Sequence, residues 1–142
     1  MTDELMTFKA SGEDTGGAYS LTDSMVPPQG DPPPHIHHRE DEAFRVLEGE
    51  LEVLVGENKF KAGAGSFVHL PKGVLHSYQN VGTGPARLLT LMVPAGLERF
   101  VEEVGKPGTE LSSPRPFEEG DIDKLLALAP EYGVEIPPPP EP

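Results

Sequence analysis

The segment His35-Ile36-His37 places the strongest constraint on how this chain folds. Side chains of an extended strand alternate between its two faces, so two histidines one residue apart share a face only on extended backbone. Glu42 has the wrong parity to share that face on the same straight strand. The polar run 38–41 predicts a turn, after which Glu42 comes back on a neighbouring strand and points into the same space.

A third histidine, His76, follows the turn sequence Pro71-Lys72-Gly73 far along the chain. Three imidazoles and one carboxylate that converge from strands would form a metal site, and they suit a divalent transition ion better than calcium. Two alternatives stay open: the histidines are only structural, or Glu40 or Asp41 turns inward in place of Glu42. The candidate metal ligands are His35, His37, Glu42 and His76.

The stretch from residue 42 to residue 93 predicts a meander of short strands separated by turns. The 17 prolines and 16 glycines of the chain favour many short elements over a helical bundle. We predict strands at 43–48, 51–55, 59–61, 66–70, 74–81 and 86–93. Earlier in the chain, an edge strand within 1–10, a polar loop at 11–17 and a strand at 18–26 are expected, the last at a sheet edge or dimer contact.

Beyond Pro94 the hydrophobic period changes from that of strands to that of helices. One predicted helix presents Leu97, Phe100, Val101 and Val104 on one side and ends at Gly105; a second begins near Asp121 with Ile122, Leu125, Leu126 and Ala129 inward. We therefore predict one domain, with a barrel core at about 18–94, a helical extension at about 95–134 and a flexible, proline-rich tail at 135–142.

The net charge of −13 bears on the partners of the protein. A surface this acidic repels phosphate backbones and anionic lipids, so we expect neither nucleic acid nor a membrane as a partner. The chain has no cysteine, so any bound metal must use nitrogen and oxygen ligands. Its first residues lack a signal pattern, and its most apolar run, 88–97, is too short to span a bilayer. We expect a cytoplasmic protein.

The motifs around these histidines resemble those of the cupin superfamily. The first motif, a glycine, HxH, a glutamate and a second glycine, is matched by Gly30, His35, His37, Glu42 and Gly49. Four residues separate its first glycine from its first histidine, where the family pattern has five. The second motif is matched at every spacing by Gly65, Pro71, Gly73, His76 and Asn80. The resemblance implies an all-β fold, the cupin jelly-roll barrel (double-stranded β-helix), with short C-terminal helices.

Within that superfamily, segment 32–44 is similar to small single-domain proteins labelled quercetin 2,3-dioxygenase-like. The resemblance implies that His35, His37, Glu42 and His76 hold one divalent transition metal ion: Fe, Mn, Ni, Cu, Co or Zn. It also implies that Glu42 takes a proton from the substrate as a base. Arg45 stands where these relatives commonly carry tyrosine, and this departure puts the substrate in doubt. By strand parity Arg45 faces away from Glu42, on an outer face.

We therefore expect a metal-dependent cupin with dioxygenase-like oxidoreductase chemistry on a small aromatic or enolisable substrate. Phe44 and Val46 share the parity of Glu42, and Tyr78 that of His76, which makes all three candidate substrate-binding residues or members of the barrel core. The alternatives are a non-catalytic cupin that binds a metal or small molecule as a sensor or store, and an isomerase or hydrolase with a Lewis-acid metal. The resemblance and the apolar amino-terminal strand predict a homodimer.

Overall fold

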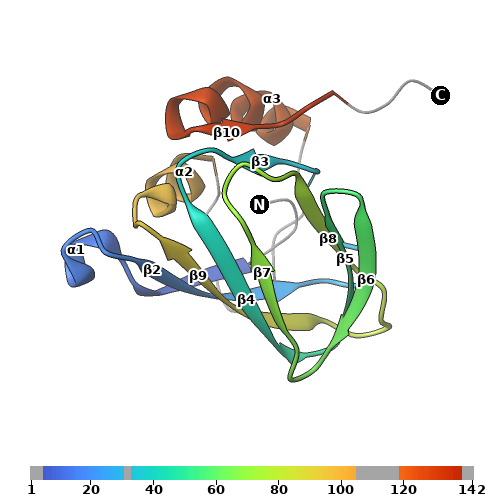
Figure 1. Cartoon of the computed structure of the whole chain (residues 1–142). Coiled ribbons are helices and arrows are strands. Elements are labelled where there is room, and N and C mark those ends of the chain that lie inside the picture. The colour runs from blue at the N-terminus through green and yellow to red at the C-terminus, as the bar shows by residue number, and fades with distance from the viewer. Residues whose placement is uncertain (1–4, 31–32, 105–118, 139–142) are drawn as a thin grey trace.

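The computed structural model describes residues 5–30, 33–104 and 119–138, and strands dominate it (Figure 1). A five-stranded sheet has the order β1 (Leu5–Ala10), β2 (Ser20–Val26), β9 (Ala86–Val93), β4 (Asp41–Glu48), β7 (Phe67–Leu70). A three-stranded sheet has the order β6 (Asn58–Gly63), β5 (Glu50–Val55), β8 (His76–Asn80). Every pairing within these two sheets is antiparallel. The all-β, jelly-roll prediction is confirmed.

One apolar core lies between the two sheets. On each strand the residues of one parity point inward, as the alternation of strand side chains requires. The five-stranded sheet contributes Val26, Phe44, Val46, Val68, Leu70, Ala86 and Leu88, and the three-stranded sheet contributes Leu51, Val53 and Ala62. Burial of these side chains from both sheets is the main force that holds the sandwich together.

The amino-terminal part differs from the prediction in two ways. Strand β2 lies inside the five-stranded sheet, between β1 and β9, and not at its edge, which β1 occupies. The polar segment 11–17 contains a short helix, α1 (Gly12–Thr15). The Asp14 carboxylate accepts a hydrogen bond from the Ser11 backbone N–H at 2.9 Å, which caps this helix and offsets the weak helix propensity of Gly12.

The carboxyl-terminal part forms a second, smaller core against the end of β9. It consists of α2 (Leu97–Val104), α3 (Glu119–Leu128), the 3₁₀ helix η1 (Ala129–Tyr132) and β10 (Val134–Glu135). Its buried side chains are Met92, Leu97, Phe100, Leu125, Ala129 and Val134. Both predicted helices are present, but Leu126 is 48% exposed and not inward. The inward positions predicted for Val104 and Ile122 lie outside the described side chains.

Strand β10 was not predicted, and it pairs with β3 (Ile36–His37), the strand that carries the His-x-His segment. The predicted flexible tail therefore starts too early, because Glu135 pairs with Ile36. Just before β10, the Gly133 carbonyl accepts a hydrogen bond from the His38 backbone N–H at 2.8 Å. Figure 1 shows α3 and β10 across one end of the sandwich, beside β3. The carboxyl-terminal extension thus supports the backbone of the candidate site.

No helix in the described ranges 5–30, 33–104 and 119–138 has the length and apolar character needed to cross a membrane.

Asn80 provides a test of how the sandwich closes at the end of β8. Its buried side chain donates to the carbonyls of Val26 (3.0 Å) and Gly84 (2.9 Å) and accepts from the Gly82 N–H (2.9 Å). Asn80→Ala removes three hydrogen bonds worth roughly 1 kcal/mol each, so we expect the free energy of unfolding to fall by about 2–4 kcal/mol in urea denaturation. Asn58→Ala, at the exposed start of β6, should change it by less than about 0.5 kcal/mol.

Candidate metal centre

The three histidines predicted as ligands converge in the fold. A two-bond backbone bridge joins His35 to His76: the His35 N–H donates to the His76 carbonyl at 3.0 Å, and the His76 N–H donates back at 2.9 Å. The extended backbone of β3 then turns His37 to the same side as His35. One ring nitrogen from each residue lies within 4.8 Å of the others, and all three side chains are buried. This cluster could hold a metal ion.

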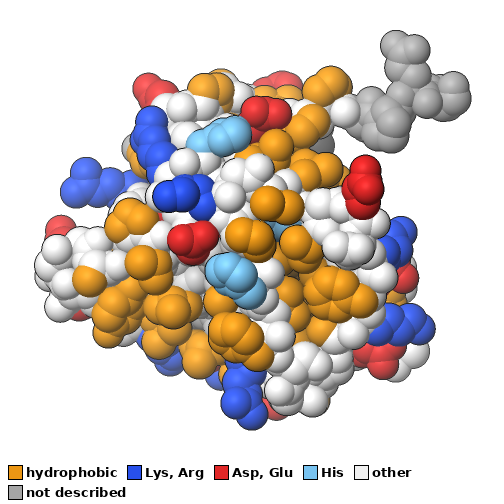
Figure 2. All heavy atoms as spheres, viewed as in Figure 1, with side chains coloured by type: hydrophobic (Ala, Val, Ile, Leu, Met, Phe, Trp, Pro, Cys, Tyr) orange, Lys and Arg blue, Asp and Glu red, His pale blue; other side chains and the backbone are white. Residues whose placement is uncertain are grey.

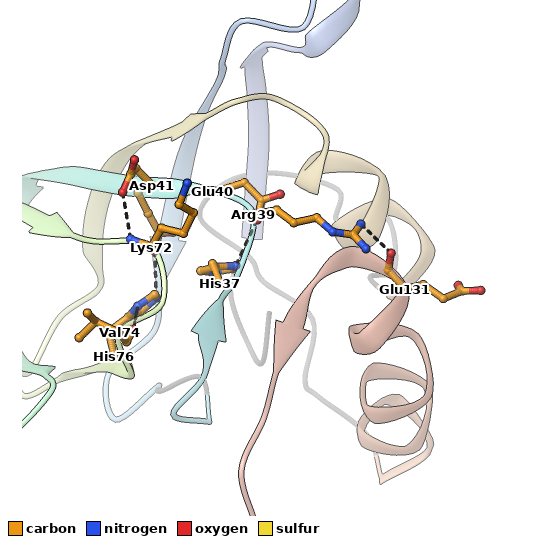
Figure 3. Close-up of polar contacts among 9 residues, drawn as sticks. His37, Arg39, Glu40, Asp41, Lys72, Val74, His76 and Glu131 are labelled. Atoms are coloured by element: carbon orange, nitrogen blue, oxygen red, sulfur yellow. Dashed lines mark hydrogen bonds and ion pairs between the residues drawn. The ribbon is translucent and has the colours of Figure 1, made fainter.

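In two of the rings, a backbone carbonyl lies beside Nδ1 and favours a proton on that nitrogen. His35 Nδ1 lies 2.8 Å from the Pro33 carbonyl oxygen, and His76 Nδ1 lies 3.4 Å from that of Val74 (Figure 3). Because a carbonyl oxygen only accepts, these two contacts favour the tautomer with the proton on Nδ1, which leaves a lone pair on Nε2. These are the tautomers in which Nε2 can bind a cation.

Glu42 brings its carboxylate to the same place from β4. Its Oε2 lies 3.1 Å from His76 Nε2, and its side chain is 14% exposed. Burial alone would raise the pKa of Glu42, but the contact with His76 and the nearby rings of His37 and His35 lower it to about 2. The carboxylate is therefore ionised at neutral pH, and it faces His76 Nε2, which carries a lone pair in the Nδ1–H tautomer.

The unpaired Nε2 of His76 indicates whether these residues fit a metal ion. Among the residues that the structure describes, His76 Nε2 is buried and has no hydrogen-bond partner. A lone pair and a carboxylate 3.1 Å apart repel each other unless a proton or a cation lies between them, and with Nδ1 protonated a metal ion would fill that role. Three imidazoles and one carboxylate are also a donor set suited to divalent transition ions. The residues therefore fit a metal centre.

His35 and His37 stay neutral under ordinary conditions. Burial, followed by the charges that His37 and His76 would carry, lowers the pKa of His35 to about 3. Burial also lowers the pKa of His37. Neutral imidazoles are electron-pair donors, whereas protonated ones repel a cation, so the buried site is prepared for a metal without prior loss of protons.

The two acidic alternatives to Glu42 take different positions, which Figure 3 shows. Asp41 points outward, and its carboxylate accepts the Lys72 backbone N–H at 2.9 Å. Glu40 is only 5% exposed, yet it lies at the outer edge of His37, with Oε1 3.8 Å from Nδ1. Burial raises the pKa of Glu40 to about 7; Arg39 opposes this shift, and the charges of Glu42 and Glu98 add to it. The alternation of strand side chains did not predict that Glu40 would lie buried beside His37 Nδ1.

The remaining histidines lie apart from the cluster. His38 is exposed and pairs with Glu135, its Nε2 3.1 Å from the carboxylate oxygen. His69 is exposed on β7 and pairs with Ala43, on the outer face of the sheet. Arg45, the departure from the relatives' pattern, is also exposed and shares that outer face.

The predicted substrate-binding residues lie in or against the core. Phe44 and Val46 belong to the buried apolar cluster of the sandwich, with exposures of 1% and 0%. Tyr78 packs against that cluster, and its ring meets Phe44 edge to face at a centroid distance of 5.7 Å. Their contribution to the core is clear, and their contact with a substrate stays a prediction.

The neutral burial of His35 predicts a stability that depends on pH. Unfolded histidine binds a proton near its ordinary pKa of 6.5, whereas folded His35 binds one only near pH 3. As the pH falls through this window the unfolded state takes up the proton first, so the metal-free protein should lose stability. In urea denaturation at several pH values, the free energy of unfolding of His35→Asn should fall less steeply with decreasing pH than that of the wild type.

The exposed His38 provides the matched control for this pH series. His38→Asn should keep the wild-type dependence of unfolding free energy on pH between 6.5 and 3. An unchanged dependence in His35→Asn would contradict the neutral burial of that ring.

Comparison with known proteins agrees with this fold and cluster. Residues 23–93 match the family model described as the cupin domain. The quercetin 2,3-dioxygenase of Bacillus subtilis is 26% identical over 105 residues, which cover 74% of this chain and 31% of that protein. Germin-like protein subfamily 2 member 3 of Arabidopsis thaliana is 33% identical over 136 residues, which cover 91% of this chain and 56% of that protein. The chain spans less than two thirds of either relative.

Solved structures show the same architecture. KdgF from Halomonas sp. superposes with a TM-score of 0.62 at 16% identity, over 70% of this chain and 87% of that one, which shows the fold alone. A recombinant oxalate oxidase in complex with glycolate superposes with a TM-score of 0.56 at 25% identity, over 66% of this chain and 52% of that one. With the family model matched from β2 to β9, and both histidine motifs inside the match, this chain belongs to the cupin superfamily.

Proposed function

We propose that this protein is a metal-dependent cupin with dioxygenase-like activity on a small aromatic or enolisable substrate. His35, His37, His76 and Glu42 would hold one divalent transition ion, Fe, Mn, Ni, Cu, Co or Zn. The observation that carries the proposal is the pair of facing acceptors, His76 Nε2 and Glu42 Oε2, 3.1 Å apart beside two further buried imidazoles. A metal ion between these two atoms would satisfy both at once.

The ion, when bound, supplies a Lewis-acid centre beside which substrate and dioxygen are oriented. If the bound ion takes six ligands, the four protein ligands would leave about two positions for them. Glu42 is ionised at neutral pH and has an acceptor oxygen for the proton of a substrate hydroxyl. Its lowered pKa, about 2, makes it a stronger candidate for ligand than for base, since a base works best with a pKa near the operating pH.

The charge around the centre favours a neutral substrate. Glu42 and the buried Glu40 lie close to the histidines, and the whole chain carries a net charge of −13. A bound divalent ion would offset the two nearby carboxylates, so the acidic surface as a whole would disfavour a dianion such as oxalate more than a neutral flavonol or diketone. We therefore place the substrate nearer to that named for the Bacillus subtilis relative than to that named for the oxalate oxidase.

Metal content and oxygen consumption test the proposal together. Elemental analysis of protein from its own host should find about one transition ion per chain. After reconstitution with each candidate metal, an oxygen electrode should record uptake with at least one flavonol or diketone and none with oxalate. Tight ligand binding without turnover by any metal would favour the non-catalytic sensor or store. Turnover without oxygen uptake would favour the isomerase or hydrolase.

Two histidine variants sharpen this test. His76→Ala should lose most of its metal and all oxygen uptake while its circular dichroism stays that of a folded protein, because the apolar core does not include the ligands. His69→Ala changes an exposed histidine outside the cluster and should keep both metal and activity. Full metal content in His76→Ala would overturn the ligand assignment.

The homodimer remains a proposal, and the outer face of the five-stranded sheet supports it. Phe67, Val93 and Leu91 are exposed there by 71%, 44% and 36%, and Figure 2 shows hydrophobic side chains gathered over this region. Exposed apolar area of this kind is typical of an interface, and a second copy would cover it symmetrically. Light scattering should give twice the chain mass of 15.3 kDa, and the mass of one chain would contradict the dimer.

A further inference from the structure

We propose that Glu40 is the positioning residue for His37: its carboxylate accepts a hydrogen bond from the Nδ1–H of His37 and so directs Nε2 of that ring toward the metal. The inference rests on the proposed metal centre and adds a residue outside the predicted ligand set. Glu40 does not touch the ion in this assignment. It acts only through the orientation and tautomer of His37.

The first support comes from a comparison of the three rings. His35 and His76 each have a backbone carbonyl beside Nδ1, at 2.8 and 3.4 Å. His37 has no carbonyl in that role: among the described residues, its Nδ1 is buried and has no hydrogen-bond partner. Metal-binding histidines almost always donate the other ring N–H to a carbonyl, carboxylate or water, so the third ring lacks the partner that its neighbours have.

The second support comes from Glu40 itself. Its side chain is 6% exposed, and its Oε1 is likewise buried without a hydrogen-bond partner among the described residues. Oε1 lies 3.8 Å from His37 Nδ1, so the two orphaned atoms face each other (Figure 3). In the proposed contact this distance would shorten to about 2.9 Å, the usual length of such a bond. The contact would satisfy both atoms at once, which burial makes strongly favourable.

The orphaned atoms of the site divide into two sets with two explanations. Within the described part of the chain, the buried side-chain atoms without partners are His76 Nε2, His37 Nδ1 and Glu40 Oε1. His76 Nε2 faces Glu42 at the centre, where a cation would satisfy it. The other two face each other on the far side of the His37 ring. One ion and one hydrogen bond therefore account for all three atoms.

The backbone around Glu40 is anchored in a way that leaves its side chain inward. The His38 N–H donates to the Gly133 carbonyl at 2.8 Å, and the Arg39 guanidinium donates to the Glu131 carbonyl at 2.8 Å. On the other side of Glu40, Asp41 points outward to the Lys72 backbone. The residues that flank Glu40 are thus fixed to the outside of the site.

The tautomer of His37 provides a direct test in the metal-free protein. Imidazole ¹⁵N NMR of the wild type should show the proton of His37 on Nδ1, the nitrogen that faces Glu40 Oε1. Glu40→Ala should shift His37 toward the Nε2–H form, which predominates in free imidazole side chains of histidine. A wild-type His37 ring with its proton on Nε2 would overturn the proposal, whether or not any variant folds.

Metal affinity provides the second readout, with Zn(II) as the probe in chelator competition. Glu40→Ala should bind Zn(II) roughly tenfold to a hundredfold more weakly than wild type, the usual effect of losing such a partner. Glu40→Gln should lose less, because its amide oxygen still accepts a hydrogen bond. Wild-type affinity in a folded Glu40→Ala would overturn the proposal. If that variant does not fold, the wild-type tautomer decides.

The exposed His38–Glu135 pair offers a matched control, since its carboxylate lies 3.1 Å from a ring nitrogen outside the cluster. Glu135→Ala should leave Zn(II) affinity unchanged. A wild type that binds no metal would reject the proposed function, while the NMR measurement would still judge the contact between Glu40 and His37. The two failures are therefore distinguishable.

Discussion

The backbone bridge between His35 and His76 is the interaction on which the candidate centre depends. Its two hydrogen bonds, 3.0 and 2.9 Å long, join segments that lie 41 positions apart in the chain. The bridge places His76 at the start of β8 beside the strand that carries His37, so that the spacing of the rings is set by backbone geometry and not by flexible side chains. The surrounding sandwich contributes to the site chiefly by burying the histidines, because burial favours the neutral form of their rings.

Two glutamates two positions apart have different electrostatic roles. Glu42, on β4, turns into the cluster and has its pKa lowered by the imidazoles. Glu40, in the turn before β4, lies behind His37, where burial without a firm partner raises its pKa. The same type of side chain therefore has a lowered pKa in one place and a raised pKa in the other. Position relative to the rings, and not residue type, decides which.

The sequence predicted the elements that depend on local pattern. The mostly apolar run that follows the turn at 82–85 predicted β9 at 86–93. The shared parity of His35 and His37, together with the turn before Glu42, predicted that the three side chains converge. What it missed depends on contacts between distant segments. The interior position of β2, the pairing of β10 with β3, and the burial of Glu40 behind His37 are all set by partners far away or by a turn whose side-chain directions have no period.

The pairing of β10 with β3 has a consequence for the order in which the centre is completed. A ribosome delivers all three histidines by residue 76, but the segment that anchors β3, residues 133–135, emerges almost sixty residues later. Until then the His-x-His strand lacks its neighbour along one edge. The full backbone support of the His-x-His strand thus depends on a segment that lies well beyond the last histidine of the cluster.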